Sequence, residues 1–259
     1  MRKILYTVFV LIIASSTVFS QDTIQVDEGF HREKKNIYQG EAYRGFSLHA
    51  DIFSPAMGFL VNKNIRTFEL QVDANFYNKF FPTVEAGYGQ IDVSLTTGQK
   101  YRSKSPFLRI GMNYGLINNA NKDGSEKLIR SYPFLGVRYG MGVMNYSMEN
   151  IPLSTGYWAD SQLYAFEKRA VYGGWLELVG GIRVDIYRGL TMGWSVRLKT
   201  LFHAKDKTKI WWAPGYGFTA GSQFAFNYTI GYTFHTKTER EKDKALMLEK
   251  AKEKDKNKK

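Results

Sequence analysis

Ser47, His49 and Asp51 are residues whose types and spacing could support hydrolytic or acyl-transfer chemistry. Each is separated from the next by one apolar residue, so on an extended strand all three share one face. Neighbours on that face are about 7 Å apart, a separation that permits a nucleophile and a base to cooperate. No further motif supports such a site, so we expect no catalytic residues and keep an enzyme as an alternative.

Eleven charged residues form a larger pattern, because each occupies a polar position in a segment where polar and apolar residues alternate. They are Asp51, Glu69, Asp73, Glu85, Arg109, Arg138, Glu177, Arg183, Asp185, Arg197 and Lys199. Six acids against five bases are nearly balanced, which is what an enclosed space filled by ion pairs requires. The sequence therefore predicts a lumen charge network, for which Glu69 with Arg138 and Asp73 with Arg109 are trial pairs.

The composition excludes several kinds of site. The 259 residues include no cysteine, which removes disulfides, thiolate zinc sites and cysteine nucleophiles, and only 4 histidines. We therefore expect no metal and no cofactor. The formal charge of +12 does not by itself indicate nucleic acid, and for an exported chain we expect none as a partner.

The elements that must carry these residues are strands. An aromatic content of 15%, with 24 glycines and 6 prolines, favours sheet over helix. Period-two alternation predicts eight strands. They cover residues 46–52, 68–76, 84–95, 107–114, 135–143, 176–186, 192–199 and 224–234. In the third segment the apolar residues are even-numbered up to Tyr88 and odd-numbered from Ile91. This change of apolar parity, after Gly89, predicts a β-bulge there.

The connections between these strands differ in length. Those after the second and sixth are short, whereas those after the first, third, fifth and seventh are long. Short turns at one end and long loops at the other are typical of outer-membrane barrels. The long link at 116–130 departs from this rule, and the sequence offers no explanation for it.

The polar faces of the strands are rich in small residues, as the narrow lumen of an eight-stranded barrel requires. Aromatic residues gather at strand ends, where an interfacial girdle would lie. The sequence thus predicts an all-β fold: an antiparallel up-and-down transmembrane β-barrel of about eight strands over residues 43–234.

The two ends of the chain have different characters. Residues 1–20 combine a basic start, a short apolar run and a small-residue end, and so predict a secretory signal peptide. Residues 21–42 are expected to form an N-terminal periplasmic segment. Residues 235–259 carry ten Lys or Arg and six Asp or Glu, and are expected to form a charged periplasmic tail.

Residues 43–234 resemble small Gram-negative outer-membrane barrels of the OmpX and OmpA transmembrane type. Segments 53–58, 193–197 and 213–217 resemble motifs of an uncharacterised family of such barrels. The resemblance implies a place in the cell outer membrane, with outer-membrane lipid and the barrel-assembly machinery as partners. It also implies that Tyr232 and Phe234 are an insertion signal, although 25 residues follow.

The function predicted from these observations is that of an outer-membrane barrel with a charge-plugged lumen. Its role would be structural, or binding through the loops, with at most minor solute passage; the loop ligand is not indicated. One alternative is a lipid-modifying outer-membrane barrel enzyme, and another is a soluble secreted lipocalin-like binding barrel, which has the same strand period.

Overall fold

The computed structural model describes residues 42–117, 130–153, 162–204, 210–220 and 223–241, together with residues 245 and 248. The predicted signal peptide, nearly all of the N-terminal segment and most of the link at 116–130 lie outside the described residues. The barrel belongs to the unit formed by Ile37–Lys259.

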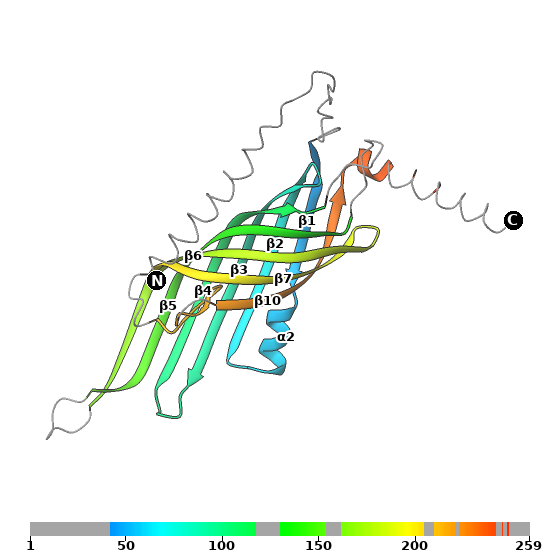
Figure 1. Ribbon diagram of the computed structural model, residues 1–259. Coiled ribbons are helices and arrows are strands. Elements are labelled where there is room, and N and C mark those ends of the chain that lie inside the picture. The colour runs from blue at the N-terminus through cyan, green and yellow to red at the C-terminus, as the bar shows by residue number, and fades with distance from the viewer. Residues whose placement is uncertain are drawn as a thin grey trace, which may run out of the picture. The chain divides into compact units, whose positions relative to one another are not determined.

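Eight strands close into one antiparallel barrel (Figure 1). They are β1 (Tyr43–Asp51), β2 (Ile65–Phe76), β3 (Phe80–Ser94), β4 (Lys100–Gly115), β5 (Tyr132–Leu153), β6 (Gln162–Tyr187), β7 (Leu190–Ala204) and β10 (Gln223–His235). Strands consecutive in this series are neighbours in the barrel, and β10 pairs with β1 to close it. The predicted antiparallel up-and-down barrel of eight strands is confirmed.

Three short elements lie between the barrel strands, and a helical segment follows β10 at residues 237–241. The helix α2 (Phe53–Leu60) follows β1, and the strands β8 (Trp212–Ala213) and β9 (Gly217–Phe218) form a small hairpin between β7 and β10. No helix among the described residues is long and apolar enough to span a membrane.

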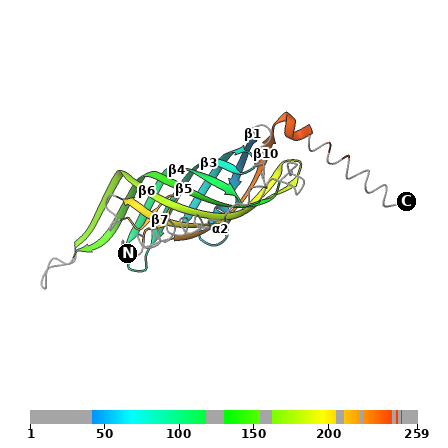
Figure 2. The same cartoon turned by 45° about the horizontal axis from the view of Figure 1, so that its top comes forward.

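The connections predicted to be short, β2–β3 and β6–β7, are short. Many of the residues predicted as long loops after the third and fifth strands instead continue the strands of the β3–β4 and β5–β6 hairpins. The β3–β4 connection is residues 95–99 only, and β5 and β6 extend to 22 and 26 residues. The β3–β4 hairpin continues because its extra residues remain in register, as in the pair Asp92 and Arg102. The extended part of β5 also pairs with β6, but with register shifts between Met144 and Tyr146 and between Met148 and Ile151. Figures 1 and 2 show β5 and β6 reaching past the other strands.

Alternation divides the barrel into two zones. In the belt zone, outward side chains are apolar and inward ones polar: Val84 is exposed and Glu85 buried. In the loop-side zone, which begins after Gly89 of β3, the faces exchange character: Ile91 is buried and Asp92 exposed. On β4 the loop-side zone likewise has Tyr101 inside and Arg102 outside.

The predicted bulge at Gly89 is wrong. The register of β3 runs without a shift against both β2 and β4 across this residue. The apolar parity changes because Ile91 and Val93 enter an apolar cluster inside the barrel, whereas Val84 and Tyr88 face outward. The backbone is continuous, and only the surroundings of its two faces change.

The barrel wall is shortest along the strand direction at β1. Strand β1 has nine residues, and its pairing with β10 ends at Asp51 opposite Thr229. Within the part of the chain that the structure describes, no strand therefore lies between the outer parts of β2 and β10, residues 65–69 and 223–228, and α2 packs beside both. The helix approaches β2 closely at Gly58, where a Cβ would be 2.6 Å from the carbonyl oxygen of Ile65.

Candidate functional site

A buried carboxylate, Glu85, occupies the centre of the lumen and pairs with three arginines. Its Oε2 accepts from Arg109 Nη1 at 2.9 Å and from Arg197 Nη1 at 3.0 Å, and its Oε1 pairs with Arg138. Glu85 is fully buried, and each arginine is 2% exposed. A buried carboxylate requires such partners because desolvation disfavours its charge.

Two further carboxylates extend this central cluster. Glu69 accepts from Arg109 at 2.5 Å and Arg197 at 2.8 Å. Glu177 lies 2.8 Å from Arg109 Nε and 4.0 Å from Lys199 Nζ. Three carboxylates and four cations, contributed by the six strands β2 to β7, thus fill the middle of the lumen. The cluster joins strands that are not neighbours in the sheet.

A smaller polar cluster lies apart from this one. Arg183 Nη1 donates to Asp73 at 2.7 Å and to the Tyr132 hydroxyl at 3.3 Å. The Nδ1 of His49 is 3.5 Å from Asp73, and its Nε2 is 2.9 Å from the Thr191 hydroxyl. Aspartate and arginine again occur as a pair in the interior.

The trial pairs predicted from the sequence are wrong. Glu69 pairs with Arg109 and Arg197 rather than Arg138, and Asp73 pairs with Arg183 rather than Arg109. Residues meet across the lumen according to the stagger of the strands, and the position of a residue within its own strand does not reveal that stagger.

Nine of the eleven predicted lumen residues belong to these two clusters, and Asp51 and Asp185 do not. The Asp51 carboxylate accepts from the backbone N–H groups of Phe53 and Ser54 at 3.0 and 3.2 Å, and so caps the start of α2. The Asp185 carboxylate lies 3.9 Å from the guanidinium group of Arg130, a residue that precedes β5 in the chain.

Ser47, His49 and Asp51 do not form a catalytic arrangement with one another. The Ser47 hydroxyl bonds Thr233 at 2.9 Å, while His49 bonds Thr191 and Asp51 caps α2. All three are buried on the inner face of β1. Each side chain has a structural partner elsewhere, and His49 is not positioned to activate Ser47.

The segment 210–218 folds into the barrel above the central cluster, which the sequence pattern did not reveal. The carbonyl oxygen of Gly215 accepts from Arg109 Nη2 and from Lys199 Nζ, both at 2.7 Å. Gly215 has φ +80°, and a Cβ there would be 2.7 Å from the Phe107 ring, so this close approach requires glycine. The sequence marks the segment only by its glycines and aromatic residues, which also suit an exposed loop.

Aromatic packing holds this segment in place. The Tyr101 hydroxyl donates to the carbonyl oxygen of Trp212 at 3.0 Å, and Tyr216 packs against Trp175 with ring centres 6.1 Å apart. Trp175 in turn donates from Nε1 to Glu177 at 2.7 Å. The apolar interior of the loop-side zone and the central charge cluster are therefore one connected structure.

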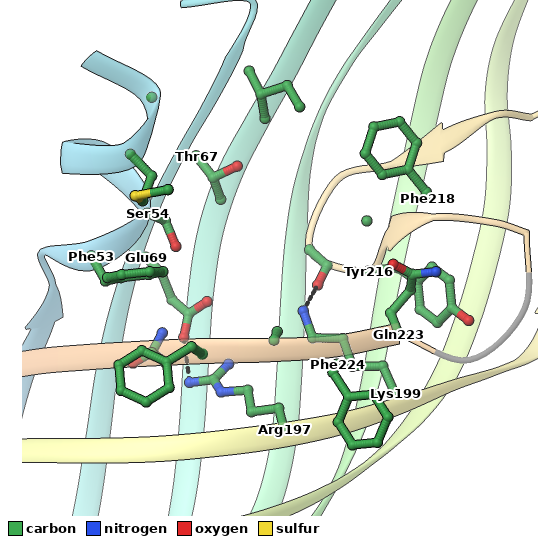
Figure 3. Close-up of a pocket in the computed structure, with 18 of the residues that line it drawn as sticks. Phe53, Ser54, Thr67, Glu69, Arg197, Lys199, Tyr216, Phe218, Gln223 and Phe224 are labelled. Atoms are coloured by element: carbon green, nitrogen blue, oxygen red, sulfur yellow. Dashed lines mark hydrogen bonds and ion pairs between the residues drawn. The ribbon is translucent and has the colours of Figure 1, made fainter. Parts of the chain in front are cut away.

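A cavity of about 410 Å³ lies beside this segment, between α2, β2, β7 and β10 (Figure 3). Figure 3 shows Phe53, Ser54 and Phe224 around it, with the Glu69–Arg197 ion pair and Lys199 on its polar side. No group of three or more His, Asp or Glu side chains among the described residues is arranged to hold a metal ion.

Comparison with known proteins places this chain in a family. Residues 1–237 match the family described as "Domain of unknown function (DUF6048)". The chain belongs to that family. No curated protein shows significant similarity to it.

Two solved structures share a weak likeness with this DUF6048 chain. Neisserial surface protein A aligns with a TM-score of 0.37 and 9% identity, over 75% of this chain and 98% of that one. Ail, the attachment invasion locus protein of Yersinia pestis, in complex with the heparin analogue sucrose octasulfate, aligns with a TM-score of 0.31 and 12% identity, over 74% and 95%. The assignment of a barrel fold to this chain follows from its own strand order. The two similarities add no argument about function.

Proposed function

We propose that this protein is an outer-membrane barrel whose lumen is closed, and that it acts as a structural element or binds partners through its loop-side zone. The observation that carries this proposal is the central charge cluster together with segment 210–218. Buried ion pairs occupy the middle of the lumen, and the segment covers them. Free passage of solutes would require both to move.

The belt zone supports a membrane location. Its outward side chains are large, apolar and exposed, including Phe68, Val72, Val137 and Leu178 at 45–58% exposure. A continuous apolar surface of this kind is costly in water and suits lipid. On β3 and β4 of the loop-side zone the exposed outward residues are polar and Ile91 and Tyr101 enter an apolar cluster inside, as for a β-structure in water.

The loop-side zone supports a binding role. The β3–β4 and β5–β6 hairpins extend past the belt zone and carry charged residues on their outer faces, such as Asp92, Arg102 and Glu149. Polar surfaces on a rigid scaffold are suited to contacting a partner. This zone is where we place such a contact.

Fractionation of expressing cells tests the membrane location. The folded protein is expected in the outer-membrane fraction, to resist extraction by salt, and to migrate differently on gels before and after heating. Release by salt without detergent would contradict the location and favour a soluble lipocalin-like barrel.

Planar-bilayer recording tests the closed lumen. The unmodified protein is expected to give small, flickering conductance at most. The double variant Trp212→Ala with Tyr216→Ala, which removes packing that holds segment 210–218, is expected to conduct more often. A large, steady conductance in the unmodified protein would refute the plug.

We further propose that Tyr232 and Phe234 form the insertion signal read by the barrel-assembly machinery. Phe234 stacks on Phe46 of β1 with ring centres 4.7 Å apart, at the seam where the barrel closes. Tyr232→Ala with Phe234→Ala is expected to lower the yield of assembled barrel. Deletion of residues 242–259 is the control, because it retains Glu239, the partner of buried Arg44. Normal assembly of the double variant would refute the signal.

A further inference from the structure

The cavity beside α2 occupies the place where the barrel wall is incomplete. Pairing between β1 and β10 ends at Thr229, and pairing between β1 and β2 ends at Leu70. Beyond these residues α2 stands where a strand would continue the wall. A helix cannot join the ladder of hydrogen bonds between strands. After the Ile52 N–H, which donates to the Tyr228 carbonyl oxygen at 2.9 Å, α2 therefore closes the wall mainly by packing.

The cavity reaches both sides of this incomplete wall. Its lining includes Ala225 and Asn227, which are on the inner face of β10, and Phe224 and Phe226, which are on the outer face. Phe224 is 78% exposed and Phe226 48%. A cavity that touches both faces of one strand passes around its edge, and therefore connects the lumen with the apolar outer surface.

The two ends of the cavity have opposite chemistry. Towards the outside it is lined by apolar side chains, among them Phe53 and Met57 of α2 and Phe226 of β10. Towards the lumen it is lined by Arg197 and Lys199, with Glu69 beside them. An occupant that satisfies both ends is an amphiphile with an anionic group.

The charges of the central cluster favour an anion at the inner end. Its four cations exceed its three carboxylates by one, and the nearby Asp51 carboxylate is already bonded to N–H groups of α2. Lys199 is the weakest-paired cation of the cluster. Its Nζ donates to the Gly215 carbonyl and is 4.0 Å from Glu177, whereas the arginines contact carboxylates at 3.0 Å or less.

We propose that this cavity binds one anionic membrane lipid, which enters sideways beneath α2. The phosphate lies at Lys199, and an acyl chain leaves between α2 and Phe226 to join the surrounding lipid. A volume of about 410 Å³ is in the range of small-molecule sites and accommodates a headgroup with the start of its chains. The proposal rests on the membrane location proposed above.

Native mass spectrometry of the full chain tests this proposal. Protein folded in a zwitterionic detergent is titrated with dimyristoyl phosphatidylglycerol, with phosphatidylcholine of the same chains, and with glycerol 3-phosphate. One phosphatidylglycerol is expected to stay bound. Phosphatidylcholine is expected to bind at least about tenfold more weakly, because its trimethylammonium group would bring a positive charge next to Lys199 and Arg197. Equal retention of both lipids would overturn the proposal, and so would equally tight binding of glycerol 3-phosphate, which would identify a free phosphate as the occupant.

Variants locate the bound lipid within the barrel. Lys199→Gln is expected to weaken phosphatidylglycerol binding about tenfold, and Lys199→Arg to preserve it. Lys104→Gln, on the outer face of the loop-side zone, is the matched control. Ala225→Trp fills the cavity without changing charge and is expected to abolish binding. Unchanged binding in Lys199→Gln or in Ala225→Trp would overturn the assignment.

Heat-modifiable migration of each variant separates loss of the site from loss of the fold. If Lys199→Gln fails to fold, Ala225→Trp decides the proposal without altering the charge cluster. A protein that enters membranes but retains no phosphatidylglycerol would refute only the lipid site. A protein that does not enter membranes would refute the proposed function itself.

Discussion

The belt zone and the loop-side zone are built from the same strands yet have opposite faces. On β3, Glu85 is inside and Val84 outside, whereas six residues later Ile91 is inside and Asp92 outside. The register is unbroken between them. The alternation of polar and apolar residues in a strand therefore reflects what surrounds each of its two faces. Where apolar residues move from one face of a strand to the other, the surroundings can have changed while the backbone continues without a bulge.

The interiors of the two zones are also stabilised by different interactions. The belt zone is held inside by ion pairs, which depend on every partner being present. The loop-side zone is held inside by aromatic and aliphatic packing around Tyr101, Trp175 and Trp212. Substitutions matched between the zones should therefore differ in size and in dependence on salt.

The largest effect is expected for Glu85→Gln in the belt zone. It removes the carboxylate that three buried arginines share, and loss of one partner of a buried pair costs about 3–5 kcal/mol. Denaturant unfolding in detergent micelles measures the loss. The double variant Glu85→Gln with Arg138→Gln should recover part of it, with a coupling of about 0.5–3 kcal/mol. Additive effects would show that the two side chains do not act as a pair.

Val72→Arg comes next, because it places a charge on the outer face of the belt zone. At the midplane of a bilayer an outward arginine costs about 2–4 kcal/mol. The yield and stability of folding into lipid vesicles measure this cost, and Leu178→Arg should behave alike. Ser94→Arg, outward in the loop-side zone, should change stability by less than about 0.5 kcal/mol. Equal tolerance at residues 72 and 94 would remove the distinction between the zones.

Ile91→Val tests the apolar interior of the loop-side zone. Removing one methylene from a packed cluster costs about 0.5–1.5 kcal/mol, and Ile91 is 4% exposed. Ile110→Val, outward in the belt zone, should cost less because fluid lipid chains fill the space. Unfolding of both variants under one condition compares them, and a larger loss at Ile110 would reverse the expected order.

The smallest effect is expected for Arg102→Gln on the outer face of the loop-side zone. Arg102 is 3.3 Å from both Asp92 and Glu149, but its side chain is 51% exposed, so the loss should be about 0–1 kcal/mol. That loss should shrink further in high salt, while the loss in Glu85→Gln should not. A salt-independent loss at Arg102 would indicate a desolvated pair.

Much of the fold could be predicted from the sequence because period-two alternation is a local property. Residues 224–234 alternate without a break, and they lie within β10. Apart from the end residues Ile52 and Leu95, the predicted strand segments also fall on strands. The helix α2 was not predicted, since its eight residues are apolar nearly throughout and give no helical period.

The sequence by itself determined the number of strands, the face on which each charge lies and the near balance of those charges, because each is encoded in neighbouring residues. Only the tertiary structure decided that Glu69 meets Arg109 and Arg197, that segment 210–218 folds inward, and that β1 ends early enough for α2 to complete the wall. These features depend on the stagger of strands around a closed barrel, which is set by all eight strands together.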